Sequence, residues 1–286
     1  MILDGKVVAA SIKEQLKEEI DAAVANGRRK PRLVIISVGD DPASKVYVRN
    51  KTKAAEEVGI IAHHFPMQAD LVTTEYVKES ISLFNADSSC DGIMVQLPLP
   101  KHLDERAIID AIDPSKDVDG LTTTNIGRLR SGQDCLKPCT AQGIIDLCKY
   151  YNIELDGKDV TIIGRSNIVG KPLADLMMAE GATVTQCHSH TKEMALHTMA
   201  AHIVVSAIGK PKHFNQDYFA YDTEAVIDVG INRDEDGKLC GDVDYEDVKD
   251  YVENITPVPG GVGPMTVAEL MKNVVQAWKI NKIQGE

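Results

Sequence analysis

Short runs of apolar residues alternate with helical stretches along almost the whole chain, and this alternation constrains the fold more than any other feature of the sequence. The first half is predicted to contain strands at 33–38, 60–65 and 92–96, separated by helices near 42–58 and 74–85 and followed by one near 104–112. The second half repeats the rhythm, with strands predicted at 159–163, 182–187, 203–207 and 225–229. Continuous apolar strands separated by helices are typical of a buried, mainly parallel sheet. The sequence therefore predicts an α/β fold.

The chain is long enough for two domains. Its 286 residues exceed one average domain, and the stretch 113–132 is rich in residues that form loops. We place one domain at residues 1–119 and a second at 120–265, with a cleft between them. Thr266 and Glu269 have the spacing of a capping box, which predicts a last helix from 266 to about 279. We expect residues 266–286 to pack back on the first domain.

The composition argues against several classes of protein. A net charge of -12 argues against general binding to nucleic acid or to a membrane surface. No apolar run reaches transmembrane length, and the first residues lack the pattern of a signal peptide. The six cysteines include no C-x-x-C pair, so reduced thiols are expected. These features together predict a cytoplasmic protein.

A lysine interrupts the apolar face of the helix predicted at 42–58. Pro42 suits a first helical turn and Gly59 a C-terminal stop. At helical spacing one stripe of this helix, predicted to be buried, contains Tyr47, Lys51, Ala54, Ala55 and Val58. A lysine on the buried side loses hydration of its charge, and it can then accept a proton near neutral pH. The alternative is that Lys51 lays its stem along the core and extends its amine into solvent.

The second half contains a strand, a glycine turn and a helix in immediate succession. The strand at 159–163 leads into Gly164, and a helix is predicted from 173 to 180 with a stop at Gly181. Backbone N–H groups and the helix dipole at such a turn can bind a pyrophosphate. Gly164 would form the tight turn and Gly170 would allow close packing of helix on strand. The spacing is not G-x-G-x-x-G, so a plain link between strand and helix remains the alternative.

The end of the next strand distinguishes between nicotinamide cofactors. An NAD-binding unit usually has an acidic residue there for the ribose hydroxyl, but 188–191 contains none. Ser189 and His190, together with Arg165 of the glycine turn, suit a 2′-phosphate better than a free ribose. The sequence therefore predicts NADP rather than NAD.

A metal site is the rival interpretation of this segment. Cys187, His188 and His190 lie close together in the sequence, and the two histidines would share one face of an extended strand. No further ligand follows at a recognisable spacing, so no metal is predicted. The third and fourth strands also end in glycine turns, at 206–211 and 228–232, on the rim where a dinucleotide would lie.

Three further segments carry distinctive residues. The strand predicted at 92–96 ends in Gln96 and runs into the prolines of 97–100. Residues 114–120 place Asp117 and Asp119 beside a turn, and 257–266 is a stiff, glycine-lined loop. Each segment alone is more often structural, because prolines shape turns and an aspartate in a loop usually caps or solvates it.

Together and in this order, these motifs closely resemble the bifunctional methylenetetrahydrofolate dehydrogenase/methenyltetrahydrofolate cyclohydrolase family. The resemblance covers essentially the whole chain. It rests on five collinear segments: Tyr47-x-x-x-Lys51, Val95 to Leu99, Asp117-Val118-Asp119-Gly120, Gly164-Arg165-Ser166 through Pro172, and Pro257 to Met265. It implies oxidation of 5,10-methylenetetrahydrofolate by NADP to the methenyl compound, followed by hydrolysis to 10-formyltetrahydrofolate.

The resemblance also implies an organisation. Residues 1–119 with 266–286 would form a folate-binding catalytic domain, and 120–265 an NADP-binding domain of the Rossmann type, with the folate in the cleft between them. The protein would be a homodimer with tetrahydrofolate derivatives as substrates. It would act in one-carbon metabolism, which serves purine, methionine and histidine biosynthesis.

The residues that match the family's motifs receive expected roles. Lys51 would assist proton transfer in the hydrolysis, and Gln96, an amide that cannot act as a base, would hydrogen-bond Lys51 and orient it. Tyr47 would pack against the folate, and Asp119 would pair with the N–H donors of the pterin, while Asp117 caps the turn. The expected catalytic residues are Lys51, Gln96, Tyr47 and Asp119. The expected substrate-binding residues are Tyr47, Gln96, Pro98, Asp119, Gly260 and Gly261, and the cofactor-binding residues are Gly164, Arg165, Ser166, Ser189, His190 and Ile231.

One position departs from the family's pattern. The family commonly has Lys or Arg after the serine of the His-Ser-x-Thr segment, where this chain has His190. A histidine is mostly neutral at pH 7, so a weaker or pH-dependent preference for NADP is expected, with NAD as a possible second cofactor. Two alternative functions remain at this point: another NADP-dependent oxidoreductase, and a nucleotide sensor without catalytic activity.

Overall fold

The computed structural model describes residues 1–283, and the chain forms two compact units. Unit 1 comprises Met1–Ala10 and Thr140–Thr266, and unit 2 comprises Ser11–Cys139 and the chain from Val267 onward. Two long helices, α1 (Gly5–Ala25) and α10 (Val262–Ile283), contribute residues to both units. Among the residues described, no helix is long and apolar enough to cross a membrane.

This division differs from the predicted one at two places. The first ten residues belong to unit 1, where the Leu3 N–H donates to the Ile255 carbonyl at 2.9 Å. Residues 120–139 belong to unit 2, because Leu136 lies in its core and the Cys139 thiol donates to the Val118 carbonyl at 3.2 Å. Both differences arise from contacts between segments far apart in the sequence.

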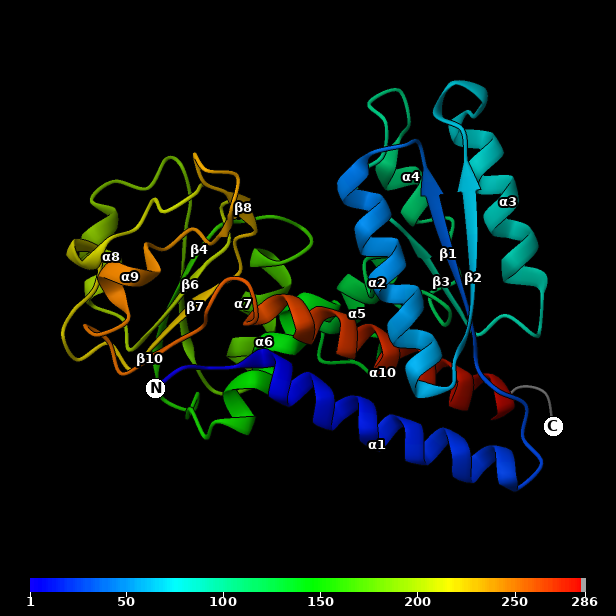
Figure 1. Ribbon diagram of the computed structural model, residues 1–286, viewed down its shortest axis with the longest axis horizontal. Coiled ribbons are helices and arrows are strands. Elements are labelled where there is room, and N and C mark those ends of the chain that lie inside the picture. The colour runs from blue at the N-terminus through cyan, green and yellow to red at the C-terminus, as the bar shows by residue number, and fades with distance from the viewer. Residues whose placement is uncertain (284–286) are drawn as a thin grey trace. The chain divides into compact units, whose positions relative to one another are not determined.

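Unit 2 is built on a three-stranded parallel sheet, as predicted (Figure 1). The strand order is β2-β1-β3, with β1 (Arg32–Val38) in the centre. Its other strands and its helices are β2 (Ile61–Met67), β3 (Gly92–Val95), α2 (Pro42–Val58), α3 (Thr74–Ala86), α4 (Glu105–Ile109) and α5 (Thr123–Arg130), with a short 3-10 turn η1 (Ala69–Leu71). The central strand has no edge in contact with solvent, which suits its apolar sequence.

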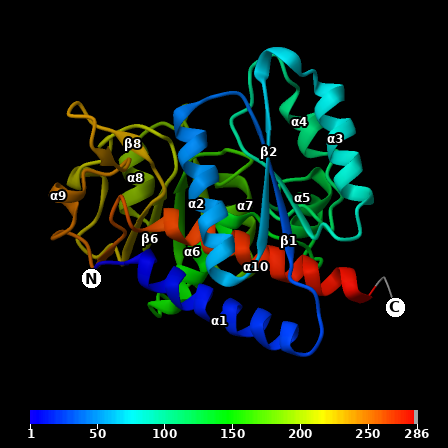
Figure 2. The same cartoon turned by 45° about the vertical axis from the view of Figure 1, so that its right-hand side comes forward.

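Helices cover both faces of this sheet (Figures 1 and 2). Leu33 and Ile35 of β1 pack with α2 and with the parts of α1 and α10 that belong to unit 2. Val34 and Ile36 point the other way and pack with α3 and α4. The strict alternation follows from the two-residue period of a strand. The C-terminal helix therefore joins the core of the unit that contains most of the first half of the chain, as predicted.

Unit 1 contains a five-stranded parallel sheet in the order β10-β7-β6-β4-β5. The strands are β4 (Asp159–Ile163), β5 (Thr183–Cys187), β6 (Ile203–Ser206), β7 (Ala225–Asp228) and β10 (Asn254–Ile255), and a small antiparallel hairpin pairs β8 (Asn232–Arg233) with β9 (Leu239–Cys240). The helices are α6 (Cys139–Tyr150), α7 (Gly170–Ala179), α8 (Met194–Met199) and α9 (Tyr245–Val248), with the 3-10 turn η2 (Gln216–Tyr218). All four strands predicted for the second half are present.

The predicted start of the last helix is wrong. Helix α10 begins at Val262, so Thr266 lies inside it and is not an N-cap. The Thr266 hydroxyl instead lies 3.4 Å from the Val262 carbonyl one turn back and 3.1 Å from the Thr140 hydroxyl. Pro264 falls in the first turn, where a missing N–H costs no intrahelical hydrogen bond.

Two buried carboxylates lie at one end of the unit 1 sheet. Asp228 ends β7 and is 3% exposed, and Asp242 is fully buried. Burial raises the pKa of Asp228 to about 7, and the neighbouring charge of Asp242 adds to the rise, although backbone N–H donors oppose it. Asp228 therefore holds a proton more tightly in the folded protein than in the unfolded chain.

The stability of the protein should depend on the protonation of Asp228. The protonated carboxyl contributes stability that is present below about pH 4 and is lost as the pH rises toward about 7. In Asp228→Asn this dependence is absent, so the free energy of unfolding of the wild type minus that of the variant should decrease from pH 4 to pH 7 in urea titrations.

Asp110→Asn is the matched control. Hydrogen bonding to Arg106 lowers the pKa of Asp110 to about 2, so its contribution is constant above pH 4. A difference between wild type and Asp228→Asn that stays constant from pH 4 to pH 7 would contradict the prediction.

Candidate functional site

Helix α2 positions the lysine that the sequence analysis identified. The Asp41 carboxylate accepts the Ser44 N–H at 2.7 Å as N-cap, Pro42 occupies the first turn, and Gly59 ends the helix with φ of 91°. Lys51 is only 9% exposed, on the face of α2 that packs on the core. The prediction that Lys51 lies on the buried side of a helix is confirmed.

The predicted burial of Tyr47 is wrong. Its side chain is 38% exposed, and Val48 takes the buried position one turn before Lys51. Val48 and Tyr47 lie three and four residues before Lys51, and only Val48 belongs to the core of unit 2. Tyr47 is thus open to a ligand on the surface of unit 2.

Gln96 is the hydrogen-bonding partner of Lys51. It follows the last residue of β3, and its N–H donates to the Ile36 carbonyl of β1 at 2.8 Å. The Lys51 amine donates to Gln96 Oε1 at 3.1 Å, and Gln96 Nε2 donates to the Leu97 carbonyl at 2.6 Å. The predicted contact is confirmed. Because both ends of the amide are engaged, its oxygen is fixed toward the lysine.

A tight turn places Asp119 next to the same strand. Asp117 bridges to Ile93 of β3, and its buried carboxylate accepts the N–H groups of Gly120, Leu121 and Thr122 at 2.8–3.2 Å. Asp117 therefore caps the turn, as predicted. Within the part of the chain that the structure describes, the half-buried Asp119 carboxylate accepts no hydrogen bond from the protein, so it is available to a ligand.

Cys139 and Asn273 hold the backbone of this turn. The Cys139 thiol donates to the Val118 carbonyl at 3.2 Å, and Asn273 Nδ2 donates to the Val118 and Lys137 carbonyls, both at 2.8 Å. Neither residue was predicted from the sequence to belong to the site. The available signal was a single amide, Asn273, on an otherwise apolar stripe of the last helix.

The buried Cys139 thiol lies within the electrostatic influence of several site residues. Burial raises the pKa of this thiol well above its ordinary value. The negative charges of Asp119 and Glu269 raise it further, and the charge of Lys51 opposes them. Since Lys51 and Asp119 both act on this thiol, unit 2 brings the two side chains into the same neighbourhood.

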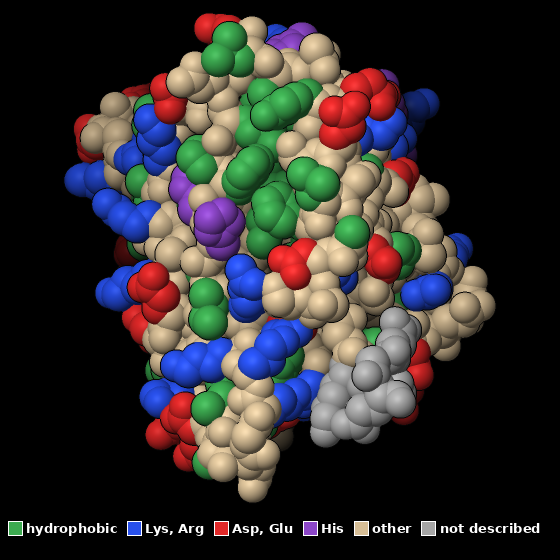
Figure 3. Space-filling model, turned by 90° about the vertical axis from the view of Figure 1, so that its right-hand side faces the viewer, with side chains coloured by type: hydrophobic (Ala, Val, Ile, Leu, Met, Phe, Trp, Pro, Cys, Tyr) green, Lys and Arg blue, Asp and Glu red, His purple; other side chains and the backbone are tan. Residues whose placement is uncertain are grey.

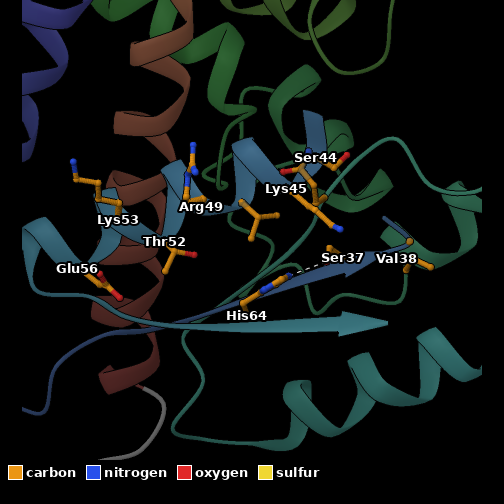
Figure 4. A pocket seen from close by; sticks show the side chains of 12 residues that line it. Ser37, Val38, Ser44, Lys45, Arg49, Thr52, Lys53, Glu56 and His64 are labelled. Atoms are coloured by element: carbon orange, nitrogen blue, oxygen red, sulfur yellow. Dashed lines mark hydrogen bonds between the residues drawn. The ribbon is translucent and has the colours of Figure 1, made fainter. Parts of the chain in front are cut away.

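A pocket of about 340 Å³ opens between α2 and the strands β1 and β2 (Figure 4). Its lining includes Gln96, so it borders the Lys51 site, and it also carries the cationic side chains of Lys45, Arg49 and Lys53. Ser37 and His64 hydrogen-bond across the two strands at 2.8 Å. Burial lowers the pKa of His64, and the neighbouring His63 contributes to this shift.

The glycine turn of unit 1 is tight and closely packed. Gly164 has φ of 126°, and a Cβ there would lie 2.5 Å from the Ala207 carbonyl oxygen. A Cβ on Gly170 would lie 2.2 Å from the Gly164 carbonyl oxygen, so helix and strand touch at this point. The Ser166 hydroxyl accepts the Val169 N–H at 3.1 Å. The prediction that Gly164 forms a tight turn and that Gly170 allows close packing of helix on strand is confirmed.

The segment after β5 forms a compact turn, and β5 pairs with β4, the strand that leads into the glycine turn. The His188 N–H donates to the Thr191 hydroxyl at 2.9 Å, and the His190 N–H to His188 Nδ1 at 3.1 Å. Ser189 and His190 are exposed, as is Arg165 of the glycine turn. The histidines thus lie in a turn and not on one face of a strand. Among the described residues, no group of three or more His, Cys, Asp and Glu side chains is placed to hold a metal ion.

The remaining predicted residues are distributed over both units. Pro98 is exposed in unit 2, after a cis peptide bond at Leu97, and Ile231 is 49% exposed in unit 1. Gly260 and Gly261 belong to unit 1 and are buried. A Cβ on Gly261 would lie 2.7 Å from the Thr256 Cβ, so packing within the loop already requires a glycine there.

These features define a class of protein: an α/β enzyme with one dinucleotide-binding unit and one catalytic unit that presents a buried lysine. Two family descriptions match the chain. Residues 3–119 match the catalytic domain of tetrahydrofolate dehydrogenase/cyclohydrolase, and residues 138–282 match its NAD(P)-binding domain. The chain belongs to the tetrahydrofolate dehydrogenase/cyclohydrolase family.

Individual relatives agree with this assignment. The bifunctional protein FolD of Agathobacter rectalis is 51% identical over 97% of this chain and 99% of its own. The crystal structure of FolD from Campylobacter jejuni, a methylenetetrahydrofolate dehydrogenase/cyclohydrolase, superposes with a TM-score of 0.94 at 44% identity, over 98% of this chain and 99% of its own. FolD of Trypanosoma brucei, solved with NADP and an inhibitor, gives a TM-score of 0.91 at 37% identity, over 98% and 97%. The predicted family, fold and class of enzyme are confirmed.

Proposed function

We propose that this enzyme oxidises 5,10-methylenetetrahydrofolate with NADP and hydrolyses the resulting 5,10-methenyl compound to 10-formyltetrahydrofolate. The observation that carries the proposal is the buried hydrogen bond between Lys51 and Gln96 in the catalytic unit. A buried amine held by a neutral amide supports proton-transfer chemistry, which the second reaction requires and a simple binding protein does not. The Trypanosoma brucei relative, solved with NADP, supports the choice of cofactor.

The oxidation needs a folate that is held in one orientation. NADP supplies the chemistry when bound, by accepting a hydride from the methylene carbon and leaving a methenyl cation on the folate. Tyr47 presents an exposed ring for packing against the aromatic system of the substrate. Asp119 offers a carboxylate without a protein partner to the N–H donors of the pterin. These contacts fix the position of the carbon that reacts.

The hydrolysis adds water to the methenyl carbon and breaks one of its bonds to nitrogen. Lys51 takes the proton that the attacking water loses and returns a proton to the nitrogen that is released. Gln96 is a positioning residue in this scheme, because it accepts a hydrogen bond from the amine without adding charge to the site. One proton is released overall for each formyl group formed.

The proposed NADP contacts lie on unit 1. The turn between Gly164 and Gly170 would bind the pyrophosphate. Arg165, Ser189 and His190 are exposed beside it and would face the 2′-phosphate. His190 supplies less positive charge at pH 7 than a lysine or arginine, so NAD should be used as a weaker second cofactor.

A homodimer is also proposed, with β2 as a feature that favours it. This strand has a neighbour, β1, on one side only among the residues described, and Ile61 is 49% exposed. Figure 3 shows hydrophobic side chains gathered beside histidines on the face that carries β2 and α3. An open strand edge with exposed apolar groups favours pairing with another chain.

The protein is also proposed to act in the cytoplasm, which its net charge and composition fit. Its products would there serve purine, methionine and histidine biosynthesis.

Substitution of Lys51 by Met should separate the hydrolysis from general damage to the protein. Lys51→Met keeps the length and apolar stem of the side chain but removes its proton-transfer group, so hydrolysis of methenyltetrahydrofolate should fall by about 100-fold or more. Lys17→Met is the matched control, because Lys17 lies on α1 in the same unit, outside the pocket lining, with its side chain 54% exposed. The measurement is an optical assay that follows reduced nicotinamide and methenyl product separately.

The same assay distinguishes the alternatives. Wild-type protein that reduces NADP with another substrate and leaves methenyltetrahydrofolate intact would indicate a different oxidoreductase. Folded protein that binds NADP without any turnover would indicate a nucleotide sensor. Equal hydrolysis by Lys51→Met and Lys17→Met would refute the role of Lys51.

Replacement of His190 by Arg should strengthen the preference for NADP. Arginine adds a permanent charge that pairs with phosphate, so the ratio of kcat/KM for NADP to that for NAD should rise about tenfold, or about 1.4 kcal/mol. His197→Arg adds the same charge to the exposed surface of α8 and controls for the general field of the unit. An unchanged ratio in His190→Arg would exclude His190 from the phosphate site.

A further inference from the structure

The Asp242 carboxylate joins three segments of unit 1. It is fully buried and accepts four hydrogen bonds. Oδ2 accepts the Ser206 hydroxyl at 2.9 Å and the Ile208 N–H at 2.7 Å. Oδ1 accepts the Lys210 N–H and the Asn232 side-chain amide, both at 2.9 Å. One side chain therefore fixes the loop after β6 and the loop after β7.

Asp228 in turn fixes the backbone of Asp242. Its Oδ1 accepts the N–H groups of Gly230 at 2.9 Å and of Asp242 at 3.0 Å, and its Oδ2 accepts the Val243 N–H at 2.8 Å. A Cβ on Gly241 would lie 1.8 Å from Asp228 Oδ2, and one on Gly230 would lie 2.3 Å from Asp242 Oδ1. Glycines are thus required at both places for the two carboxylates to fit.

The donors to the two carboxylates are neutral groups. Among the described residues, no lysine or arginine forms an ion pair with Asp228 or Asp242, and the donors are backbone N–H groups, one hydroxyl and one amide. Burying a carboxylate in this way costs free energy. An apolar contact could hold a loop in place at a smaller cost in free energy. The cost suggests a functional requirement for the exact shape of these loops.

The loops lie on the edge of the sheet where a dinucleotide binds. Ser206 pairs with Ile163 of β4 and with Asp228 of β7, so these strand ends are adjacent. The Ala207 carbonyl also touches the Gly164 turn. In a sheet of this type the pyrophosphate lies at the first turn and the two nucleotides lie on either side of it. The turn at His188–Thr191 occupies the β5 side, which leaves the β6 and β7 side for the nicotinamide half.

We propose that Asp242 is a positioning residue for the nicotinamide half of NADP, acting through the loops 207–210 and 230–232 that it holds together. Asp228 supports it by fixing the Asp242 backbone. Ile231, which is 49% exposed at the tip of the second loop, would then be presented to the cofactor by this arrangement. The inference rests on the proposed use of NADP and adds the residue that shapes the site.

Asp242→Asn tests the proposal, because an amide of equal size turns a donor toward the N–H groups that the carboxylate accepts. The dissociation constant of NADPH, measured by its fluorescence, should rise about tenfold, and the KM for NADP should rise with it. Hydrolysis of added methenyltetrahydrofolate without NADP depends on the other unit and should stay within about twofold of the wild type. General unfolding would instead reduce binding and hydrolysis together.

Two further variants keep the test decisive. Ser206→Ala removes one of the four hydrogen bonds without adding a group, so it should raise the NADPH dissociation constant about threefold even if Asp242→Asn does not fold. Thr223→Ala removes a buried hydroxyl that accepts the Ala220 N–H at the opposite end of β7, and it should leave NADPH binding unchanged.

The outcomes separate this inference from the proposed function. Wild-type protein that fails to bind NADPH would contradict the function itself. Wild-type protein that binds NADPH, together with folded Asp242→Asn and Ser206→Ala that bind it equally well, would overturn the role of Asp242 alone. Parallel loss of NADPH binding and hydrolysis in Ser206→Ala would also overturn it.

Discussion

The parallel pairing of strands is the constraint on which the rest of the structure depends. Parallel strands end at the same edge, and their buried centres leave room for polar chemistry only beyond those ends. In unit 2 this edge carries Gln96 and the turn of Asp119, and α2 brings Lys51 to it. In unit 1 this edge carries the Gly164 turn and the hydrogen bonds of Asp242. One rule of chain geometry therefore places residues far apart in sequence next to one another.

Buried hydrogen bonds hold Lys51 and the backbone of the Asp119 turn. Gln96 holds the lysine amine, Asp117 caps the turn that contains Asp119, and Asn273 binds the Val118 carbonyl in that turn. Unpaired, each of these buried groups would cost on the order of 1–3 kcal/mol, so the networks are specific as well as stabilising. Lys51 and the turn of Asp119 are thus held in place by the protein before any ligand binds, which lowers the entropy lost on binding.

Local signals were enough to predict much of this structure from the sequence. Apolar runs gave the strands, and Pro42 and Gly59 gave the ends of the helix that buries Lys51. The prediction that Tyr47 is buried was wrong because helical spacing alone does not determine how wide the buried face of a helix is. The predicted start of α10 was wrong because the Thr266 hydroxyl hydrogen-bonds Thr140, which lies 126 positions earlier in the chain. The role of Asp242 was not predicted for the same reason, because the groups that it binds lie in loops distant in the sequence.

A crystal structure with NADP and a folate analogue bound would test the central claim most directly. The analogue should lie in unit 2, with its one-carbon bridge beside the Lys51 amine, its pterin on Asp119 and its aromatic ring on Tyr47. Gln96 should keep its hydrogen bond to the lysine. A folate analogue bound away from Lys51, with the amine still directed only at Gln96, would contradict the assignment of Lys51 as the proton-transfer group.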